Sequence, residues 1–222
     1  MWRTASLVLT LILMASAVSA GPAPAGKMVA LQTAYHTTFE VYVAGPEQAA
    51  HGALLVPDRW GLNRRVRAWA DRLAALGYRV MAVDYFDGRR VPNRTLSRVV
   101  IKAIDPVWVA ADLRAAFRTL SRPGRRIVVV TWGRGAAFAA RQVGAAKASP
   151  GAIIAYHEAD TPGIHEVKRL NLPLLEVVSR RSLLDPGDTD SDLKSRKDAW
   201  QATVKFLHTN FELSPHRASA GR

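Results

Sequence analysis

The chain has 222 residues, a formal net charge of +13 and no cysteine. Its length suits a single domain with a substantial core, and its 49% of hydrophobic residues excludes an intrinsically disordered protein. The absence of cysteine excludes a disulfide framework, a thiolate metal site and a cysteine nucleophile.

The N-terminus has the pattern of an export signal. A short basic start precedes an apolar run, Leu7–Val18, and small residues follow up to Ala20. This pattern predicts a signal peptide over residues 1–20 and an exported protein that is periplasmic or secreted. The run is short for a membrane span, and an uncleaved anchor is the alternative.

Beyond the signal we expect a flexible lead over 21–26, one folded domain over 27–213 and a polar tail over 214–222. Without Arg3 the mature chain carries a charge of 13 − 1 = +12. Such a charge attracts anions, so an acidic partner protein or an anionic membrane surface is one expectation. The alternative explanation of this charge is a general bias toward arginine on the protein surface, without a specific partner. The basic residues are spread along the chain and do not alternate with aromatic residues, so no nucleic-acid partner is expected.

The first half of the domain predicts four strands and a helix. Alternating residues over 37–43, with 28–31 before them, favour an N-terminal hairpin. The apolar runs 53–56 and 78–83 have the pattern of strands that are buried on both faces. Between these two strands, Asn63 can cap a helix.

In the second half, a polar, arginine-rich loop precedes Asp105-Pro106, which supply the N-cap and the first turn of a helix. The remaining expected elements are strands at 127–130, 152–155 and 174–178, and helices at 135–143 and around 200–211. The alternation predicts an α/β fold with a mostly parallel central sheet and helices on both faces. Ligands of such sheets bind beyond the carboxyl ends of the strands.

Five segments have the order and spacing of a known family. They are ALLVPDRWGLN at 53–63, LGYRVMAVD at 76–84, IVVVTWGRGAA at 127–137, PLLEVV at 173–178 and DAW at 198–200. Together they resemble the dienelactone hydrolase family of the α/β-hydrolases. The resemblance covers most of the mature chain and implies an α/β-hydrolase fold and, for an active member, hydrolysis of ester or lactone bonds.

The family's nucleophile elbow is a strand that turns sharply into a helix and exposes one side chain at the tip. Its pattern, G-x-(Cys or Ser)-x-G, is matched here by Thr131-Trp132-Gly133-Arg134-Gly135. Gly135 keeps the final glycine. Gly133 lies at the nucleophile position, and a glycine cannot form an acyl-enzyme.

The other catalytic positions that the resemblance implies also differ. The acid position matches Ser182, and Asp185 can take that role only in a longer loop. No histidine lies between 183 and 199 to act as the base, and His208 is expected to face solvent. Asp58 matches an acidic residue that follows the first core strand in the family. The resemblance therefore implies a member without the catalytic triad.

Polar residues are still expected at the carboxyl edge of the sheet, where they can form a pocket for a small anionic or aromatic ligand. The expected pocket residues are Asp58, Arg59, Asp84, Trp132, Arg134, His157 and Glu158, with Ser179 as a further candidate. Arg134 also lies near a helix N-terminus, which favours anions. A remnant cleft without a ligand is the alternative.

Two His-Glu pairs, His157-Glu158 and His165-Glu166, raise the question of a metal site. Their spacing is not H-E-x-x-H and no third ligand is evident, so we expect neither a metal nor another cofactor. If hydrolysis remains, His157 is the candidate base. Thr131 is then the nearest hydroxyl along the chain, but it is expected to be buried before the turn.

These patterns lead to three hypotheses of different classes. The first is an exported, catalytically inactive pseudo-hydrolase that binds a small molecule or a partner. The second is an active ester or lactone hydrolase with a displaced catalytic centre. The third is a basic accessory protein that docks on an acidic partner or a membrane surface.

Overall fold

The computed structural model describes residues 26–89, 91–145, 150–187 and 190–211. The expected signal peptide, the flexible lead up to residue 25 and the polar tail lie outside the described residues. Within the described ranges, no helix is long and apolar enough to cross a membrane.

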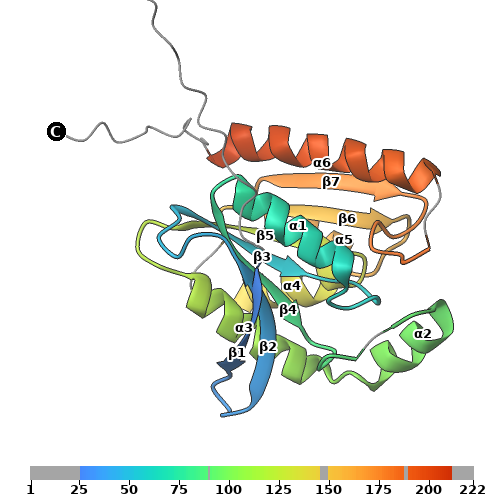
Figure 1. The fold of residues 1–222 in the computed structure, drawn as a ribbon, viewed down its shortest axis with the longest axis horizontal. Coiled ribbons are helices and arrows are strands. Elements are labelled where there is room, and N and C mark those ends of the chain that lie inside the picture. The colour runs from blue at the N-terminus through green and yellow to red at the C-terminus, as the bar shows by residue number, and fades with distance from the viewer. Residues whose placement is uncertain (1–25, 90, 146–149, 188–189, 212–222) are drawn as a thin grey trace, which may run out of the picture.

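A seven-stranded sheet forms the centre of the domain (Figure 1). Its strands are β1 (Lys27–Gln32), β2 (Thr38–Ala44), β3 (His51–Val56), β4 (Tyr78–Asp84), β5 (Arg126–Trp132), β6 (Ala152–Glu158) and β7 (Leu174–Ser179). The strands lie in the order β1-β2-β4-β3-β5-β6-β7. Strand β2 pairs antiparallel with β1 and β4, and all other neighbours are parallel. The expected hairpin and the mostly parallel sheet are confirmed.

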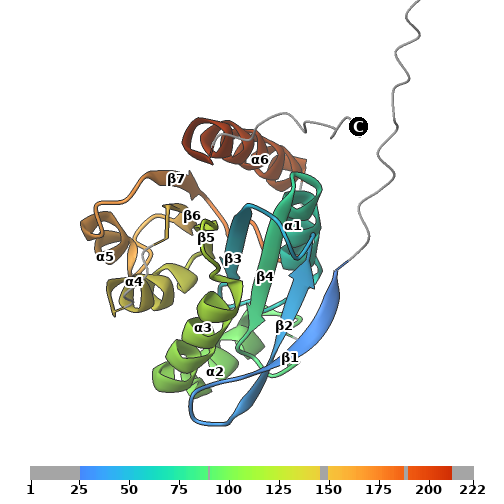
Figure 2. The same cartoon turned by 90° about the vertical axis from the view of Figure 1, so that its left-hand side faces the viewer.

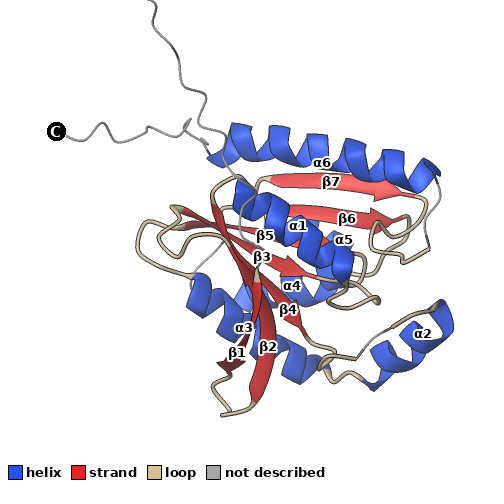
Figure 3. Ribbon diagram, viewed as in Figure 1, coloured by secondary structure: helices blue, strands red, loops and turns tan. Residues whose placement is uncertain are grey.

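Helices cover both faces of the sheet, as the α/β pattern predicts (Figures 2 and 3). They are α1 (Arg64–Ala75), α2 (Arg94–Ala103), α3 (Pro106–Leu120), α4 (Gly135–Ala145), α5 (Ile164–Arg169) and α6 (Asp190–Phe211). Helices α1 and α6 lie on one face, and α3 and α4 lie on the other (Figure 2). Helix α2 lies apart from both layers, on the side where the parallel strands end (Figure 1).

Helix α1 begins where the sequence predicts it. The Oδ1 atom of Asn63 accepts hydrogen bonds from the backbone N–H groups of Arg65 (2.9 Å) and Val66 (3.2 Å). These bonds satisfy two of the amides that a helix N-terminus leaves unpaired. The apolar stripe of α1 includes Trp69 and Leu73, both buried, and its burial fixes the helix against the sheet.

The loop expected after β4 instead contains α2. The side chain of Asn93 caps this helix by accepting a hydrogen bond from the Leu96 amide at 2.9 Å. Only Ser97 and Val100 of its ten residues are buried. A second helix that the sequence did not predict, α5, is only six residues long and follows Gly163 at φ +94°.

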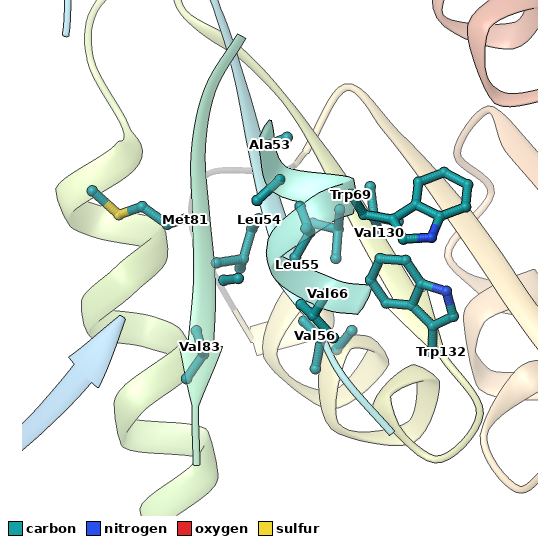
Figure 4. Close-up of a cluster of buried hydrophobic side chains, with 14 of the residues drawn as sticks. Ala53, Leu54, Leu55, Val56, Val66, Trp69, Met81, Val83, Val130 and Trp132 are labelled. Atoms are coloured by element: carbon teal, nitrogen blue, oxygen red, sulfur yellow. The ribbon is translucent and has the colours of Figure 1, made fainter. Parts of the chain in front are cut away.

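Four aromatic side chains form a cluster on the face that α1 and α6 cover. The ring of Trp69 lies 5.8 Å from Trp132, 5.1 Å from Tyr156 and 5.0 Å from Trp200 between centroids. Trp132 and Tyr156 are stacked at 5.3 Å. Figure 4 shows Trp132 beside Trp69 among the buried side chains. This cluster is therefore part of the core.

Candidate functional site

The end of β5 turns sharply into α4 at Gly133. The backbone φ angle of Gly133 is +45°, a left-handed conformation that strains residues with a side chain. Its N–H donates to the Tyr156 carbonyl at 2.8 Å, and its own carbonyl accepts from the Ala136 amide at 3.1 Å. The structure thus contains a strand–turn–helix elbow with Gly133 at its apex.

Gly135, at the first position of α4, lies against the end of β3. A Cβ atom at this position would lie 2.4 Å from the Val56 carbonyl oxygen and 2.5 Å from the Pro57 carbonyl oxygen. Both neighbours are backbone atoms, which cannot rotate away. The close packing of β3 on the elbow therefore requires glycine at residue 135.

Three residues that the family resemblance singles out meet at this elbow. A Cβ atom on Gly133 would lie 3.2 Å from the Cβ atom of Asp58. The hydroxyl of Ser182 donates to Oδ2 of Asp58, and the Trp60 amide donates to Oδ1 at 2.9 Å. The positions matched to nucleophile, acid and acidic partner are thus occupied by a glycine, a serine and a hydrogen-bonded aspartate.

The carboxyl group of Asp58 is almost completely buried, with 2% of the residue exposed. Burial raises the pKa of Asp58 from 3.8 to about 6, although the hydrogen bonds from Ser182 and the Trp60 amide oppose this shift. A carboxyl group whose pKa is higher in the folded state than in the unfolded state stabilises the folded protein when the group is protonated. This contribution is complete below about pH 4 and is lost as the pH rises through about 6.

Replacing Asp58 with asparagine should therefore stabilise the protein at pH 8 and leave its stability nearly unchanged at pH 4. The expected gain at pH 8 is roughly 1–3 kcal/mol, because the variant has no charge to bury. Urea unfolding at both pH values measures it. Asp198→Asn, at an exposed position of α6, is the matched control and should change little at either pH. An equal effect of Asp58→Asn at the two pH values would contradict this account.

A cleft of about 300 Å³ opens at the elbow, at the carboxyl edge of the sheet. Five of the seven residues expected in the pocket line it, namely Asp58, Arg59, Arg134, His157 and Glu158, and so does Ser179. Helix α2 adds Arg98, Ile101 and Lys102, which the sequence did not predict because it did not predict α2. Arg59 is paired with Glu158 at 3.2 Å. The cations Arg98, Lys102 and Arg134 have no ion-pair partner within the described part of the chain.

The other two expected pocket residues, Trp132 and Asp84, do not line the cleft. Trp132 is 1% exposed and packs in the aromatic cluster of the core. Asp84 is also buried, and its carboxylate accepts hydrogen bonds from the amides of Phe86 (3.1 Å) and Gly88 (3.0 Å). Burial raises the pKa of Asp84. Asp84 thus shapes the turn after β4.

His157, the candidate base, is held by acceptors at both ring nitrogens. Its Nε2 lies 2.9 Å from Oε1 of Glu176, and its Nδ1 lies 2.8 Å from the Glu158 carbonyl oxygen. Only an imidazole with a proton on each nitrogen makes both hydrogen bonds, and it then has no lone pair for a nucleophile's proton. Glu176 also pairs with Lys168 at 2.9 Å, and the hydrogen bonds from Lys168 and His157 lower the pKa of Glu176.

The remaining candidates lie outside the cleft or are enclosed. Thr131 is fully buried, as expected, and its hydroxyl faces the Ile154 carbonyl. Asp185 is buried and faces Arg94 and Arg181, so it pairs with arginines. Within the ranges that the structure describes, no group of three or more His, Cys, Asp or Glu residues is placed to hold a metal. His165 is exposed on α5 and His208 on α6.

The elbow at Gly133 and the position of Asp58 are those that the resemblance to the family implies. The dienelactone hydrolase family matches residues 39–182 of this chain. The chain belongs to the dienelactone hydrolase family. No curated protein matches the chain.

Solved structures support the same fold. The chain is similar to m3DLH, with 25% identity and a TM-score of 0.54 over 80% of this chain and 77% of that one. It is similar to a dienelactone hydrolase from Anabaena variabilis, with 14% identity and a TM-score of 0.58 over 82% and 97% of the two chains. A dienelactone-hydrolase-like promiscuous phosphotriesterase from metagenomic libraries shares 15% identity and a TM-score of 0.58 over 84% and 99%.

Proposed function

We propose that this member of the dienelactone hydrolase family is an exported, non-catalytic protein that binds a small anion in the cleft at the elbow. The observation that carries the proposal is Gly133 at the apex of the elbow. The apex offers no nucleophilic side chain to the cleft, and the space beside it is occupied by the hydrogen-bonded pair of Asp58 and Ser182. Export is inferred from the N-terminal sequence pattern alone.

The arrangement of His157 also supports the loss of catalysis. A general base must lie within hydrogen-bond reach of the proton that it removes. Both ring nitrogens of His157 already face acceptors, and the hydroxyls that line the cleft have other partners. Ser179 donates to the Arg181 carbonyl and Ser182 donates to Asp58.

The charge of the cleft favours an anionic ligand. Arg98, Lys102 and Arg134 line it without an ion-pair partner among the described residues. Of the acidic side chains that line it, Glu158 is paired with Arg59, the pKa of Asp58 is raised to about 6, and Asp160 is exposed and is outnumbered by the three cations. A carboxylate ligand can therefore replace water around these cations and form charge-assisted hydrogen bonds.

An assay of hydrolysis tests the loss of catalysis. The purified chain is incubated with simple activated esters and with a dienelactone-type lactone, and a heat-inactivated sample sets the background. We expect no turnover above that background. Gly133→Cys is expected to remain inactive as well, because it restores a nucleophile without a base.

Binding of phthalate, an aromatic dianion, tests the role of the cleft by calorimetry. Arg98→Gln and Arg134→Gln should each weaken binding by about tenfold, because each removes one charge-assisted contact. Arg141→Gln, at an exposed position of α4 outside the cleft, is the matched control and should bind as the wild type does. Equal affinities of all four proteins would rule out the cleft as the anion site.

One observation favours the second candidate function, an active ester or lactone hydrolase. His157 and Glu176 form a histidine–carboxylate pair at the cleft, and such a pair orients the base in many hydrolases. This candidate predicts turnover by the wild type that His157→Ala abolishes while the fold stays intact. Turnover that survives His157→Ala would remove its best base.

A further inference from the structure

A second cavity, of about 470 Å³, lies between the sheet and helices α3 and α4. Its floor is formed by Leu54 and Val56 of β3 and Val129 of β5, and its sides include Phe117 of α3 and Ala139 of α4. Ala34 and Tyr35, in the turn between β1 and β2, line it at one end. It shares no lining residue with the cleft at the elbow.

The size and lining of this cavity are typical of a ligand site. Protein interiors are packed as tightly as organic crystals, so an apolar space of this size is rarely left unfilled. Small-molecule sites usually have volumes of about 300–1,000 Å³ and apolar walls with a few polar groups. The apolar walls here come from two strands and two helices, which form a rigid frame.

Three polar side chains that line the same cavity lack partners among the described residues. Arg114 and Arg118 are four residues apart on α3, so they lie on one face of the helix, and both are exposed. Neither has an ion-pair partner within the described part of the chain. The Oε1 atom of Gln142 on α4 is buried and has no hydrogen-bond partner among the residues that the structure describes. An amide can present its oxygen or its NH₂ group at that position, so Gln142 can bond a polar group of a ligand.

We propose that this cavity binds an amphiphilic anion with a single apolar chain. The apolar chain lies against Leu54, Val129 and Phe117, and the anionic head contacts the guanidinium groups of Arg114 and Arg118 at the exposed side. This site differs from the cleft in position, lining and ligand class. It does not depend on the proposed function, because it holds whether or not the elbow is catalytic.

Decanoate and 1-decanol test the proposal on the full chain, with displacement of 1-anilinonaphthalene-8-sulfonate fluorescence as the readout. We expect decanoate to bind about tenfold more tightly than 1-decanol, because the arginines contact only the carboxylate. Ala139→Leu places extra carbon atoms in the cavity and should weaken decanoate binding by about tenfold or more. Because it fills empty space, it should leave the unfolding temperature unchanged or higher. If Ala139→Leu fails to fold, Ala111→Leu is used in its place, because it fills the same cavity from α3.

The double variant Arg114→Gln/Arg118→Gln should reduce decanoate affinity to that of 1-decanol and leave 1-decanol binding unchanged. Arg141→Gln controls for the loss of an exposed arginine outside the cavity, and the cleft variant Arg134→Gln should also bind decanoate normally. Unchanged decanoate binding in folded Ala139→Leu would overturn the site. Equal binding of decanoate and 1-decanol by the wild type would overturn the anionic ligand class.

Discussion

Replacing Gly135 with alanine is expected to lower the free energy of unfolding by at least about 3 kcal/mol, one of the largest effects of any single change in this chain. The new Cβ atom would lie 2.4 Å from the Val56 carbonyl oxygen and 2.5 Å from the Pro57 carbonyl oxygen. These close contacts can be relieved only if β3 and the start of α4 move apart. This movement disturbs Val56, which is completely buried in the sheet.

Urea unfolding of Gly135→Ala and Gly151→Ala, compared with the wild type, measures this effect. Gly151 is the matched control because a Cβ atom there would meet neighbours only at 3.4–3.6 Å, an ordinary contact distance. We expect Gly151→Ala to change the free energy of unfolding by less than about 1 kcal/mol. Similar values for the two variants would show that the elbow and β3 do not pack as closely as the structure shows.

Replacing Trp132 with alanine should lower the free energy of unfolding by about 3–5 kcal/mol, the usual cost of deleting a large aromatic side chain from a core. Trp132 is 1% exposed and its ring contacts Trp69 and Tyr156. The loss therefore leaves a cavity between the sheet and the helices that cover it.

Arg134, two residues further along the elbow, gives the contrast. Its side chain is exposed at the cleft, so Arg134→Gln should change stability by less than about 0.5 kcal/mol. Chemical unfolding measures stability, and the phthalate titration measures binding. Trp132→Ala should act on stability and Arg134→Gln on binding. A Trp132→Ala variant of wild-type stability and weakened binding would place Trp132 in the pocket after all.

Much of the fold could be predicted from the sequence because hydrophobic periodicity and capping residues are local signals. Within the ranges that the structure describes, all seven strands and four of the six helices were expected close to their observed positions. Helix α2 was not predicted because its arginines favour a polar loop, although Leu96, Val99, Val100 and Ala103 have helical spacing. Helix α5 is too short to show a period.

The site was predicted only in part because it depends on where side chains point. The meeting of Asp58, Gly133 and Ser182 follows from the family pattern, since these residues come after parallel strands. The orientation of the Trp132 side chain could be predicted from the sequence. Trp132 lies two residues after Val130, so the two side chains point to the same face of β5. Figure 4 shows both side chains on the side of α1.

The hydrogen bond between His157 and Glu176 could not be predicted from the sequence in this way. Glu176 reaches His157 from β7, and the register of β6 and β7 decides which residues of the two strands meet. Local sequence signals do not determine the register between strands that are joined by a long crossover. Arg98 and Lys102 were missed for a similar reason, because the sequence alone did not bring α2 to the cleft.

Helix α2 joins β4 to α3 and supplies two of the cations that line the cleft, yet of its residues only Ser97 and Val100 are buried, and Ile101 is partly buried against the core. Two of the three cleft cations that have no ion-pair partner among the described residues are therefore carried by a segment that contributes little to the core, and the third, Arg134, lies at the elbow. Under the proposed function, substitutions at exposed positions of α2 are expected to change which anions bind in the cleft without a large loss of stability. Under the proposed function, part of the ligand preference is thus encoded apart from the core, and α2 is a segment in which new specificity can be engineered on an unchanged frame.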